Sequence, residues 1–255
     1  MMGANLRKGH GMRYLILSDI HSNLEAFEAV LDDAGPVDQV WCLGDVVGYG
    51  PDPNGCVAQL RSLDHLCVAG NHDWATVGKL DLSDFNPDAR EANLWNRKHL
   101  SPSNLAYLES LPETLVQGDF TLLHGSPRHP IWEYIIYAST AEVNFEHFDT
   151  RYCLVGHTHT PMIFRRHQRE DGQDSEALAP TLDQPLELGS ERLIINPGSV
   201  GQPRDGDPRA SYAILDDEGL TIEHRRVAYS WERTQAKMMG QDLPLRLVLR
   251  LQYGW

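Results

Sequence analysis

Seven side chains, spread over five short segments, have the types and spacing needed to bind a pair of divalent metal ions. The segments are SDIH at 18–21, GD at 44–45, GNHD at 70–73, LLHG at 122–125 and GHTH at 156–159. The candidate ligands are Asp19, His21, Asp45, Asn71, His124, His157 and His159. Two ions about 3.5 to 4 Å apart lower the pKa of a shared water from about 15.7 toward about 7, so hydroxide becomes available as a nucleophile. The ligand set therefore indicates hydrolysis of a phosphate ester.

Each of these segments follows a short apolar run that is typical of a buried strand. The runs are YLILS, VWCLG, LCVAG, FTLLH and YCLVG, and their β-branched and aliphatic residues favour extended backbone. In a layered α/β protein, the loops past the carboxyl ends of the strands form the crevice in which ligands bind. We therefore expect side chains that are far apart in the sequence to converge at one edge of the fold.

The five segments, in this order, resemble the calcineurin-like metallophosphoesterase superfamily. The stretches GDVVGYGPDP, SPRHPIWEYI and NPGSVGQPRDGDPRASYAIL resemble its compact bacterial and archaeal phosphodiesterase branch, and the likeness runs from about Arg13 to Arg226. A single motif of this kind is weak evidence, whereas five in order with matching ligand types are specific. The resemblance implies an α/β fold, namely a four-layer α/β/β/α sandwich of two mixed β-sheets flanked by helices.

The resemblance also implies a role for each site residue. The two ligand sets would be Asp19, His21, Asp45 and His159 for the first metal, and Asp45, Asn71, His124 and His157 for the second, with Asp45 as the bridge. His72 would be the catalytic residue, which binds no metal and either protonates the leaving alkoxide or contacts a phosphoryl oxygen. The ions are expected to be manganese, with iron, zinc, nickel or cobalt as alternatives, because the nitrogen ligands suit calcium and magnesium less well.

One motif departs from the phosphoprotein phosphatase branch. That branch has GDxxDRG, in which the second Asp pairs with the catalytic His and the Arg binds the phosphate dianion. This chain has Gly48 in place of that second Asp and Tyr49 in place of the Arg. Loss of a bidentate guanidinium weakens binding of a doubly charged monoester more than of a singly charged diester. The sequence therefore favours a small-molecule or nucleotide phosphodiester as substrate, and it does not reveal what orients His72.

Three polar residues are candidates for replacing the missing phosphate contacts. Asn23 follows the first metal segment, Arg128 follows His124, and Arg204 follows the glycine-rich turn NPGSVGQP. Each has an ordinary alternative, since surface arginines are usually solvated and Asn23 could cap the helix expected at 24–34. Trp132, Tyr134 and Tyr137 could form an apolar wall for a nucleobase or aryl group, although packing within a strand or helix is the more ordinary use.

Other functions remain as alternatives. A phosphomonoesterase or phosphoprotein phosphatase would use the same metals, and GDVVGYGP is also similar to the GDxVxRGP motif of diadenosine tetraphosphate hydrolases, without its Arg. A scaffold without catalytic activity, like the retromer subunit that shares the expected fold, is disfavoured because His72 and every ligand are present here.

Composition is consistent with a cytoplasmic enzyme. The chain has 255 residues and a net charge of −14, which predicts repulsion of nucleic acid, so no stable nucleic-acid partner is expected. The four cysteines are Cys42, Cys56, Cys67 and Cys153; most lie in apolar runs without CxxC spacing, which indicates reduced, buried thiols. No apolar run is long enough to span a membrane. The oligomeric state is left open.

The order of apolar and polar segments predicts one domain at 12–255, preceded by a disordered tail at 1–11, and leaves open whether Met1 or Met12 is the natural start. Strands and helices alternate to about Val68, a helical flank follows at about 74–111, and a mobile hairpin tip is expected at about 168–190. The strands LIIN, SYAILD and LTIEHRR are expected to complete a second sheet. The last segment, LPLRLVLRLQYGW, suits either a helix or a strand.

Overall fold

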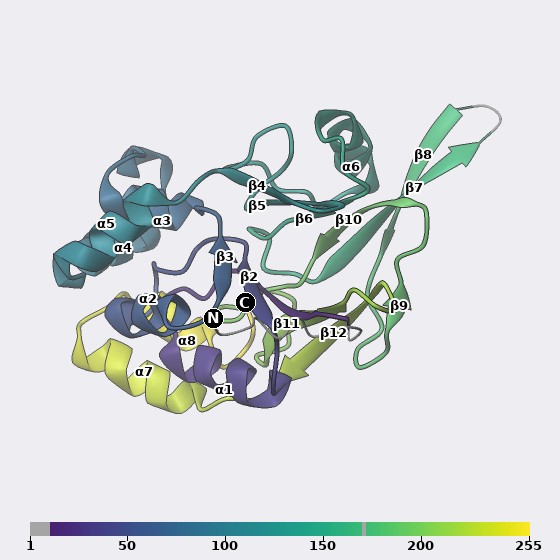
Figure 1. Ribbon diagram of the computed structural model, residues 1–255. Helices are drawn as coiled ribbons and strands as arrows, with labels where there is room; N and C mark the ends of the chain where they lie inside the picture. The colour runs from purple at the N-terminus through teal and green to yellow at the C-terminus, as the bar shows by residue number, and fades with distance from the viewer. Residues whose placement is uncertain (1–10, 170–171) are drawn as a thin grey trace, which may run out of the picture.

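The computed structural model describes residues 11–169 and 172–255, so most of the expected N-terminal tail lies outside the described residues. Its strands form two six-stranded sheets, each with parallel and antiparallel pairs (Figure 1). The first has the order β3-β2-β1-β11-β12-β9, and the second β4-β5-β6-β10-β7-β8. The strands are β1 (Arg13–Leu17), β2 (Gln39–Cys42), β3 (His65–Cys67), β4 (Thr114–Gln117), β5 (Phe120–Leu123), β6 (Tyr152–Leu154), β7 (Met162–Arg169), β8 (Gly172–Leu178), β9 (Leu186–Glu187), β10 (Arg192–Asn196), β11 (Ala210–Asp216) and β12 (Thr221–Val227).

Helices cover the outer faces of the two sheets. Helix α1 contacts β11 and β12, while α6 contacts β7 and β8 of the other sheet (Figure 1). The helices are α1 (Leu24–Ala34), α2 (Pro53–Arg61), α3 (Asn71–Val77), α4 (Pro87–His99), α5 (Pro102–Ser110), α6 (Ala138–Asn144), α7 (Trp231–Gly240) and α8 (Leu245–Arg250), with short 3-10 turns at Leu82–Asp84 and Phe145–His147. The predicted sandwich of two mixed sheets flanked by helices is confirmed.

Alternation along the strands divides the apolar core into layers. Leu15 and Leu17 of β1 pack with Phe27 of α1, whereas Tyr14 and Ile16 of the same strand pack in a second cluster. That second cluster also contains residues of β5, β6 and β10, so it fills the space between the sheets. Because successive strand side chains point to opposite faces, one apolar run serves both layers.

The structure corrects the expected membership of the second sheet. Strands β11 and β12 belong to the first sheet, because β1 pairs antiparallel with β11 in the register Arg13↔Asp216. Only β10, of the three strands expected there, lies in the second sheet. The range expected to be a hairpin tip contains strands β8 and β9, and residues 170–171 of that range lie outside the described residues. The C-terminal segment forms helix α8.

Helices α3, α4 and α5 form the expected helical flank beside the sheets (Figure 1). Asn86 caps α4 by accepting from the Ala89 amide at 3.0 Å, and Ser101 caps α5 by accepting from the Asn104 amide at 3.3 Å. Both helices have proline in the first turn, where its missing amide proton costs no hydrogen bond. Within the described residues, no helix has the length and apolar character needed to cross a membrane.

Candidate metal centre

The candidate ligands lie just past strand ends, as the sequence predicts. Asp19 follows β1, Asp45 follows β2, Asn71 begins α3 after β3, and His124 follows β5. Five of the seven have backbone φ angles in the left-handed region: Asp19, His21, Asp45, His157 and His159, with φ from 49° to 66°. Residues other than glycine seldom adopt this conformation, and such strain concentrates at functional sites. The loops therefore hold these five residues in a strained backbone conformation, and in this conformation their side chains point toward one another.

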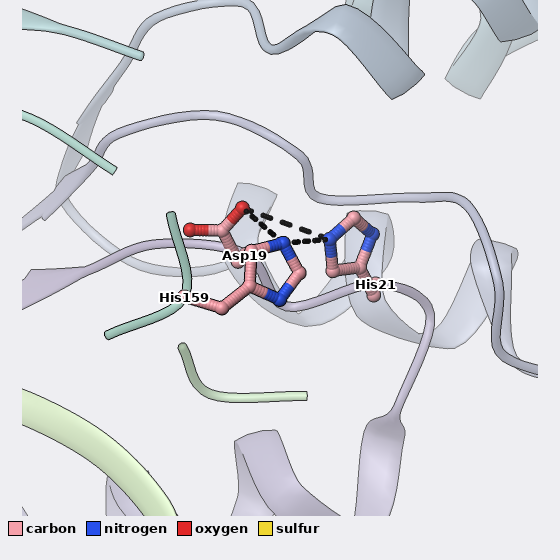
Figure 2. Close-up of side chains that lie close together, drawn as sticks. All are labelled: Asp19, His21 and His159. Atoms are coloured by element: carbon pink, nitrogen blue, oxygen red, sulfur yellow. Dashed lines mark hydrogen bonds and ion pairs between the residues drawn. The ribbon is translucent and has the colours of Figure 1, made fainter. Parts of the chain in front are cut away.

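The first group joins Asp19, His21 and His159. Asp19 Oδ1 lies 3.1 Å from His159 Nε2 and 3.6 Å from His21 Nε2, and the two imidazole nitrogens lie 3.2 Å apart (Figure 2). All three side chains are buried. Three donor atoms therefore converge on one small volume.

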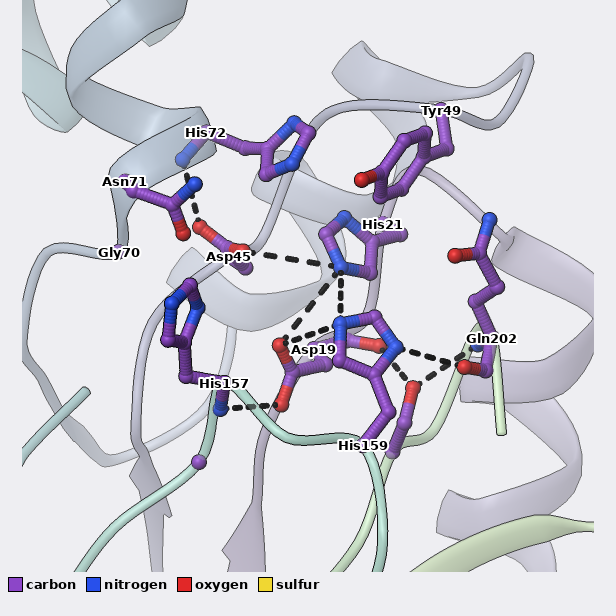
Figure 3. A network of polar contacts seen from close by, with 12 residues as sticks. Asp19, His21, Asp45, Tyr49, Gly70, Asn71, His72, His157, His159 and Gln202 are labelled. Carbon is purple, nitrogen blue, oxygen red and sulfur yellow. Dashed lines mark hydrogen bonds and ion pairs between the residues drawn. The ribbon is translucent and has the colours of Figure 1, made fainter. Parts of the chain in front are cut away.

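The second group joins Asp45, His124 and His157, with Asn71 beside them. His124 Nε2 lies 3.3 Å from Asp45 Oδ2, 3.1 Å from His157 Nδ1 and 3.1 Å from Asn71 Oδ1. Asp45 Oδ2 also lies 3.6 Å from His21 Nε2 of the first group (Figure 3). One carboxylate oxygen thus faces both groups, as a bridging ligand requires.

Each of the four imidazoles is held by a backbone carbonyl on its other nitrogen. The contacts are His21 Nδ1 to Val47 O at 3.1 Å, His124 Nδ1 to Leu43 O at 2.8 Å, His157 Nε2 to Trp132 O at 3.1 Å, and His159 Nδ1 to Gln202 O at 2.6 Å. A carbonyl only accepts, so the nitrogen that contacts it carries the proton and the inward nitrogen of the neutral ring offers a lone pair. Two such inward nitrogens at 3.1–3.2 Å repel each other unless a proton or a metal ion lies between them. Burial opposes a proton on His124, but the Asp45 carboxylate outweighs burial and raises the pKa of His124 to about 9.

The carboxylates give a second test of whether metal ions fit. Asp19 Oδ1 and Asp45 Oδ2 are buried and have no hydrogen-bond partner among the described residues. Their other oxygens accept from the His157 amide at 3.1 Å and the His72 amide at 2.8 Å. Burial alone raises the pKa of Asp45, but the neighbouring His124 outweighs it and holds that pKa well below its usual range. Among the described residues, the contacts of these two buried anionic oxygens are imidazole nitrogens at 3.1–3.6 Å, and two divalent cations would satisfy both oxygens.

His72 lies at the edge of this cluster, in the first turn of α3. Its Nδ1 lies 2.9 Å from Asn93 Oδ1 on α4, and burial lowers its pKa to about 3 despite the nearby Asp45 carboxylate. Its inward neighbours are Tyr49, at 4.3 Å between ring centroids, and His21, at 5.0 Å (Figure 3). Asn93 therefore orients the neutral ring, and no local sequence signal marked Asn93 because it belongs to a different helix.

A family model described as the calcineurin-like phosphoesterase superfamily domain matches residues 12–219, which is most of the chain. The chain belongs to this superfamily. A crystal structure of a metallophosphoesterase from Sphaerobacter thermophilus superposes with a TM-score of 0.85 at 51% identity, covering 96% of this chain and 100% of that one. An uncharacterized protein from Methanocaldococcus jannaschii is 40% identical over 250 residues, covering 94% of this chain and 97% of that protein.

A shorter match is to a symmetrical bis(5'-nucleosyl)-tetraphosphatase from Pseudomonas putida. It is 31% identical over 99 residues, which cover 32% of this chain and 34% of that protein. Because the match spans about a third of each protein, it supports the shared superfamily rather than a shared substrate.

This site lacks the Asp and Arg of the phosphatase GDxxDRG motif, and residues from other parts of the fold lie near the positions of these two groups. Tyr49 occupies the position of the phosphatase Arg, and its ring lies 4.6 Å from that of His21. Arg204, from the loop after β10, donates to Tyr49 Oη at 3.3 Å and to Gln202 Oε1 at 2.9 Å. A segment distant in sequence thus supplies a guanidinium group to the site. Arg204 lines the cleft over the metal centre, which is also lined by Asp45, His72, His157 and His159.

The other two residues considered for phosphate contacts are engaged in structural hydrogen bonds. Asn23 caps α1 by accepting from the Ala26 amide at 3.3 Å, and its amide group donates to Gly201 O at 2.9 Å. Arg128 forms an ion pair with Glu133, within its own loop. The structure brings Arg204 to the metal centre, and we do not retain Asn23 or Arg128 as substrate contacts.

Aromatic residues of the loop after β5 border the metal centre. Trp132 and Tyr134 lie in neither a strand nor a helix, contrary to the use that the sequence favoured, and both line the cleft. The Tyr134 ring stacks on His157 at 4.0 Å with a 9° angle between the planes, and Trp132 contacts Phe85 at 5.1 Å. Tyr137 is 69% exposed. The run of aromatic residues in WEYIIY was the sequence signal for an apolar wall beside the metal centre.

The same loop is anchored by a hydrogen-bond network around the half-buried carboxylate of Glu133. Its carboxylate accepts from Ser126 Oγ at 2.6 Å, from Asn144 Nδ2 at 2.9 Å and from Arg128. Burial opposes ionisation, but these donors outweigh it and lower the pKa of Glu133 to about 2. The network fixes the loop whose Trp132 carbonyl holds His157, so it stabilises the second metal group from outside.

Proposed function

We propose that this protein is a dinuclear metal-dependent phosphodiesterase that hydrolyses a small-molecule or nucleotide phosphodiester. The observation that carries the proposal is the pair of buried His and Asp groups that share Asp45, with every imidazole already oriented. When bound, the two ions supply a hydroxide nucleophile at neutral pH and positive charge for the phosphoryl oxygens. The chain would hold them through Asp19, His21, Asp45, Asn71, His124, His157 and His159, with manganese as the first expectation.

The charge of the cleft supports a diester over a monoester. Tyr49 replaces the Arg that binds the dianion in the phosphatase branch, and Arg204 already donates to Tyr49 and Gln202. Asp84 also lines the cleft and adds negative charge. A second negative charge on the phosphoryl group would therefore meet fewer free donors and one additional carboxylate.

His72 is the proposed catalytic residue. Because Nδ1 donates to Asn93, His72 would act on the leaving oxygen through Nε2, as an acid or hydrogen-bond donor when the ring carries a second proton. It lines the cleft, binds no metal in this proposal, and is held by Asn93. Positioning of such a group matters because proton transfer requires hydrogen-bond distance to the reacting oxygen. In this proposal Asn93 takes over the orienting contact of the phosphatase Asp, whereas Arg204 already donates to Tyr49 and Gln202 and does not fully replace the phosphatase Arg.

A second candidate function is hydrolysis of a dinucleoside polyphosphate. It is supported by the similarity of GDVVGYGP to the GDxVxRGP motif of the diadenosine tetraphosphate hydrolases, although the Arg of that motif is absent here. Rates with diadenosine tetraphosphate and with a simple diester, measured on the same metal-loaded protein, separate the two functions. We further propose a reducing, cytoplasmic location from the four buried free cysteines, and no stable nucleic-acid partner from the net charge of −14.

The deciding experiment compares bis(p-nitrophenyl) phosphate with p-nitrophenyl phosphate. Metal-stripped protein is reloaded with Mn²⁺, and the Asp45→Asn variant is assayed beside Asp32→Asn, which changes an exposed carboxylate of α1 in the same way. Diester turnover that needs metal and is lost only in Asp45→Asn is the expected result. Faster monoester turnover would favour a phosphatase, and no turnover with any transition metal would favour a scaffold.

A further inference from the structure

A second cavity adjoins the metal cleft on the far side of the GHTH loop. It has a volume of about 280 Å³ and is lined by Tyr134, Ile135, Ile136, Thr158, Thr160, Met162 and Arg204. Tyr134 and Arg204 line the metal cleft as well. The two spaces are therefore neighbours separated by two side chains, one aromatic and one cationic.

The wall between them is built by the metal ligands' own loop. Thr158 lies between His157 and His159 in the sequence and lines the cavity, while the two histidines converge on the candidate metal groups. Stacking of Tyr134 on His157 fixes the aromatic side of the opening. A phosphoryl group at the metal centre would therefore lie in a cleft that shares Tyr134 and Arg204 with this cavity.

The lining selects for apolar groups. Ile135, Ile136 and Met162 supply aliphatic surface, and no carboxylate belongs to the described lining. Ile136 is 52% exposed and Tyr134 is 45% exposed, so a ligand ring would remove apolar surface from water. Pockets for complete drug-sized ligands begin at about 300 Å³, so a cavity of about 280 Å³ suits one ring system rather than an oligomer.

We propose that this cavity binds the ester substituent that stays on phosphorus, and that the substituent is a planar ring, either aryl or nucleobase. The proposal rests on the proposed phosphodiesterase function and specifies its substrate class. Arg204, at the junction, contacts a phosphoryl oxygen while the ring lies against Tyr134 and Ile136. Hydrogen-bonding groups of the lining, on Thr158, Thr160 and Arg204, could also contact polar edges of the ring.

The kinetic test holds the leaving group constant and changes only the retained substituent. The Mn²⁺-loaded protein is assayed with the p-nitrophenyl esters of methyl phosphate, phenyl phosphate and thymidine 5'-phosphate. We expect kcat/KM for at least one ring-bearing ester to exceed that of the methyl ester by about tenfold or more. A higher value for the phenyl ester identifies an aryl pocket, a higher value for the thymidine ester identifies a nucleobase pocket, and equal values for all three overturn the proposal.

Two variants connect that preference to the cavity. Ile136→Ala removes lining surface at a half-exposed position, so the fold is retained, and it should lower the ring-to-methyl ratio several-fold, by about threefold or more. Val143→Ala, at a position 45% exposed on α6, removes comparable apolar surface outside the cavity and should leave the ratio unchanged. An unchanged ratio in Ile136→Ala would overturn the assignment of the ring to this cavity.

A binding measurement separates failure of this proposal from failure of the proposed function. Benzylphosphonate and methylphosphonate have no ester bond to hydrolyse, and their binding to metal-loaded protein is measured by isothermal titration calorimetry. Tighter binding of benzylphosphonate that Ile136→Ala weakens supports the ring cavity even if no ester is hydrolysed. If esters are hydrolysed but neither kcat/KM nor phosphonate binding shows a preference for the ring, the proposed hydrolase function is supported and the proposed ring-binding cavity is rejected.

Discussion

Replacing Asn93 tests whether this residue supplies the orienting contact that the phosphatase branch obtains from Asp. Asn93 is fully buried, and His72 is 3% exposed, so water does not readily replace the 2.9 Å contact between Asn93 Oδ1 and His72 Nδ1. In Asn93→Ala, the ring loses its partner in an apolar setting. A buried donor without an acceptor costs about 1–3 kcal/mol, which corresponds to about a 5- to 150-fold loss of rate if the ring must recover its orientation in each turnover.

The assay uses two diesters that differ only in their leaving group, methyl p-nitrophenyl phosphate and methyl phenyl phosphate. Because phenolate is the poorer leaving group, help from His72 matters more for the phenyl ester, and we expect Asn93→Ala to lower kcat more for that ester. Asn93→Asp restores an oxygen at the same position and should recover most of the turnover. Glu91→Ala, at an exposed position of the same helix, is the control for changes in α4.

The reasoning would be refuted by full turnover of methyl phenyl phosphate in Asn93→Ala. Metal content and melting temperature are measured for each variant, because an equal loss with both esters together with loss of metal would indicate a structural role for Asn93. Rescue by Asn93→Asp, but not by other small residues, distinguishes orientation of the ring from simple packing.

Three further predictions follow from the geometry. Gly48→Ala should lower the free energy of unfolding by about 2 kcal/mol or more and abolish turnover, because the new Cβ would lie 2.6 Å from His72 Nδ1. The control is Gly118→Ala, which is also at positive φ but has nothing within 4 Å of the new Cβ, and it should cost only about 1 kcal/mol in chemical denaturation. Asp19→Ala should lower bound manganese by about one ion per chain in elemental analysis, and retention of both ions would contradict its assignment as a ligand. The folded pKa of Glu133 is about 2, below its ordinary 4.5, so its ionised form stabilises the fold above about pH 4.5 and this contribution is lost as pH falls toward 2. The melting-temperature difference between wild type and Glu133→Gln should therefore narrow on acidification, and a constant difference would show that its charge is irrelevant.

The residue types of the metal centre and their place at strand ends could be predicted from the sequence. Apolar runs determine buried strands, and the ligand that follows each run must lie near a strand's carboxyl end, so convergence follows from local signals and chain order. The superfamily resemblance added the pairing of ligands into two groups. The caps of α4 and α5 could also be read locally, because a capping side chain and its amide partner are three residues apart.

Sheet membership could not be obtained in this way. Strands β11 and β12 have the same alternation whether they extend the first or the second sheet, and the antiparallel pairing of β1 with β11 joins residues about 200 positions apart. Alternation specifies which face of a strand is buried, but not which neighbour supplies the hydrogen bonds. The same limit explains why the loop aromatics Trp132 and Tyr134 were not placed beside the metal centre.

The sequence by itself determined the residue types of the candidate metal centre and the superfamily, because ligand type and local strand order are found in contiguous segments. Only the tertiary structure decided how the departures from the phosphatase motif are compensated: Asn93 from α4 reaches His72, and Arg204 from the loop after β10 reaches Tyr49. It also decided the histidine tautomers, since each of the four carbonyls that hold the rings comes from a segment distant in sequence from the histidine it contacts. Such contacts depend on the approach of separate elements in space, and spacing along the chain carries no record of that approach.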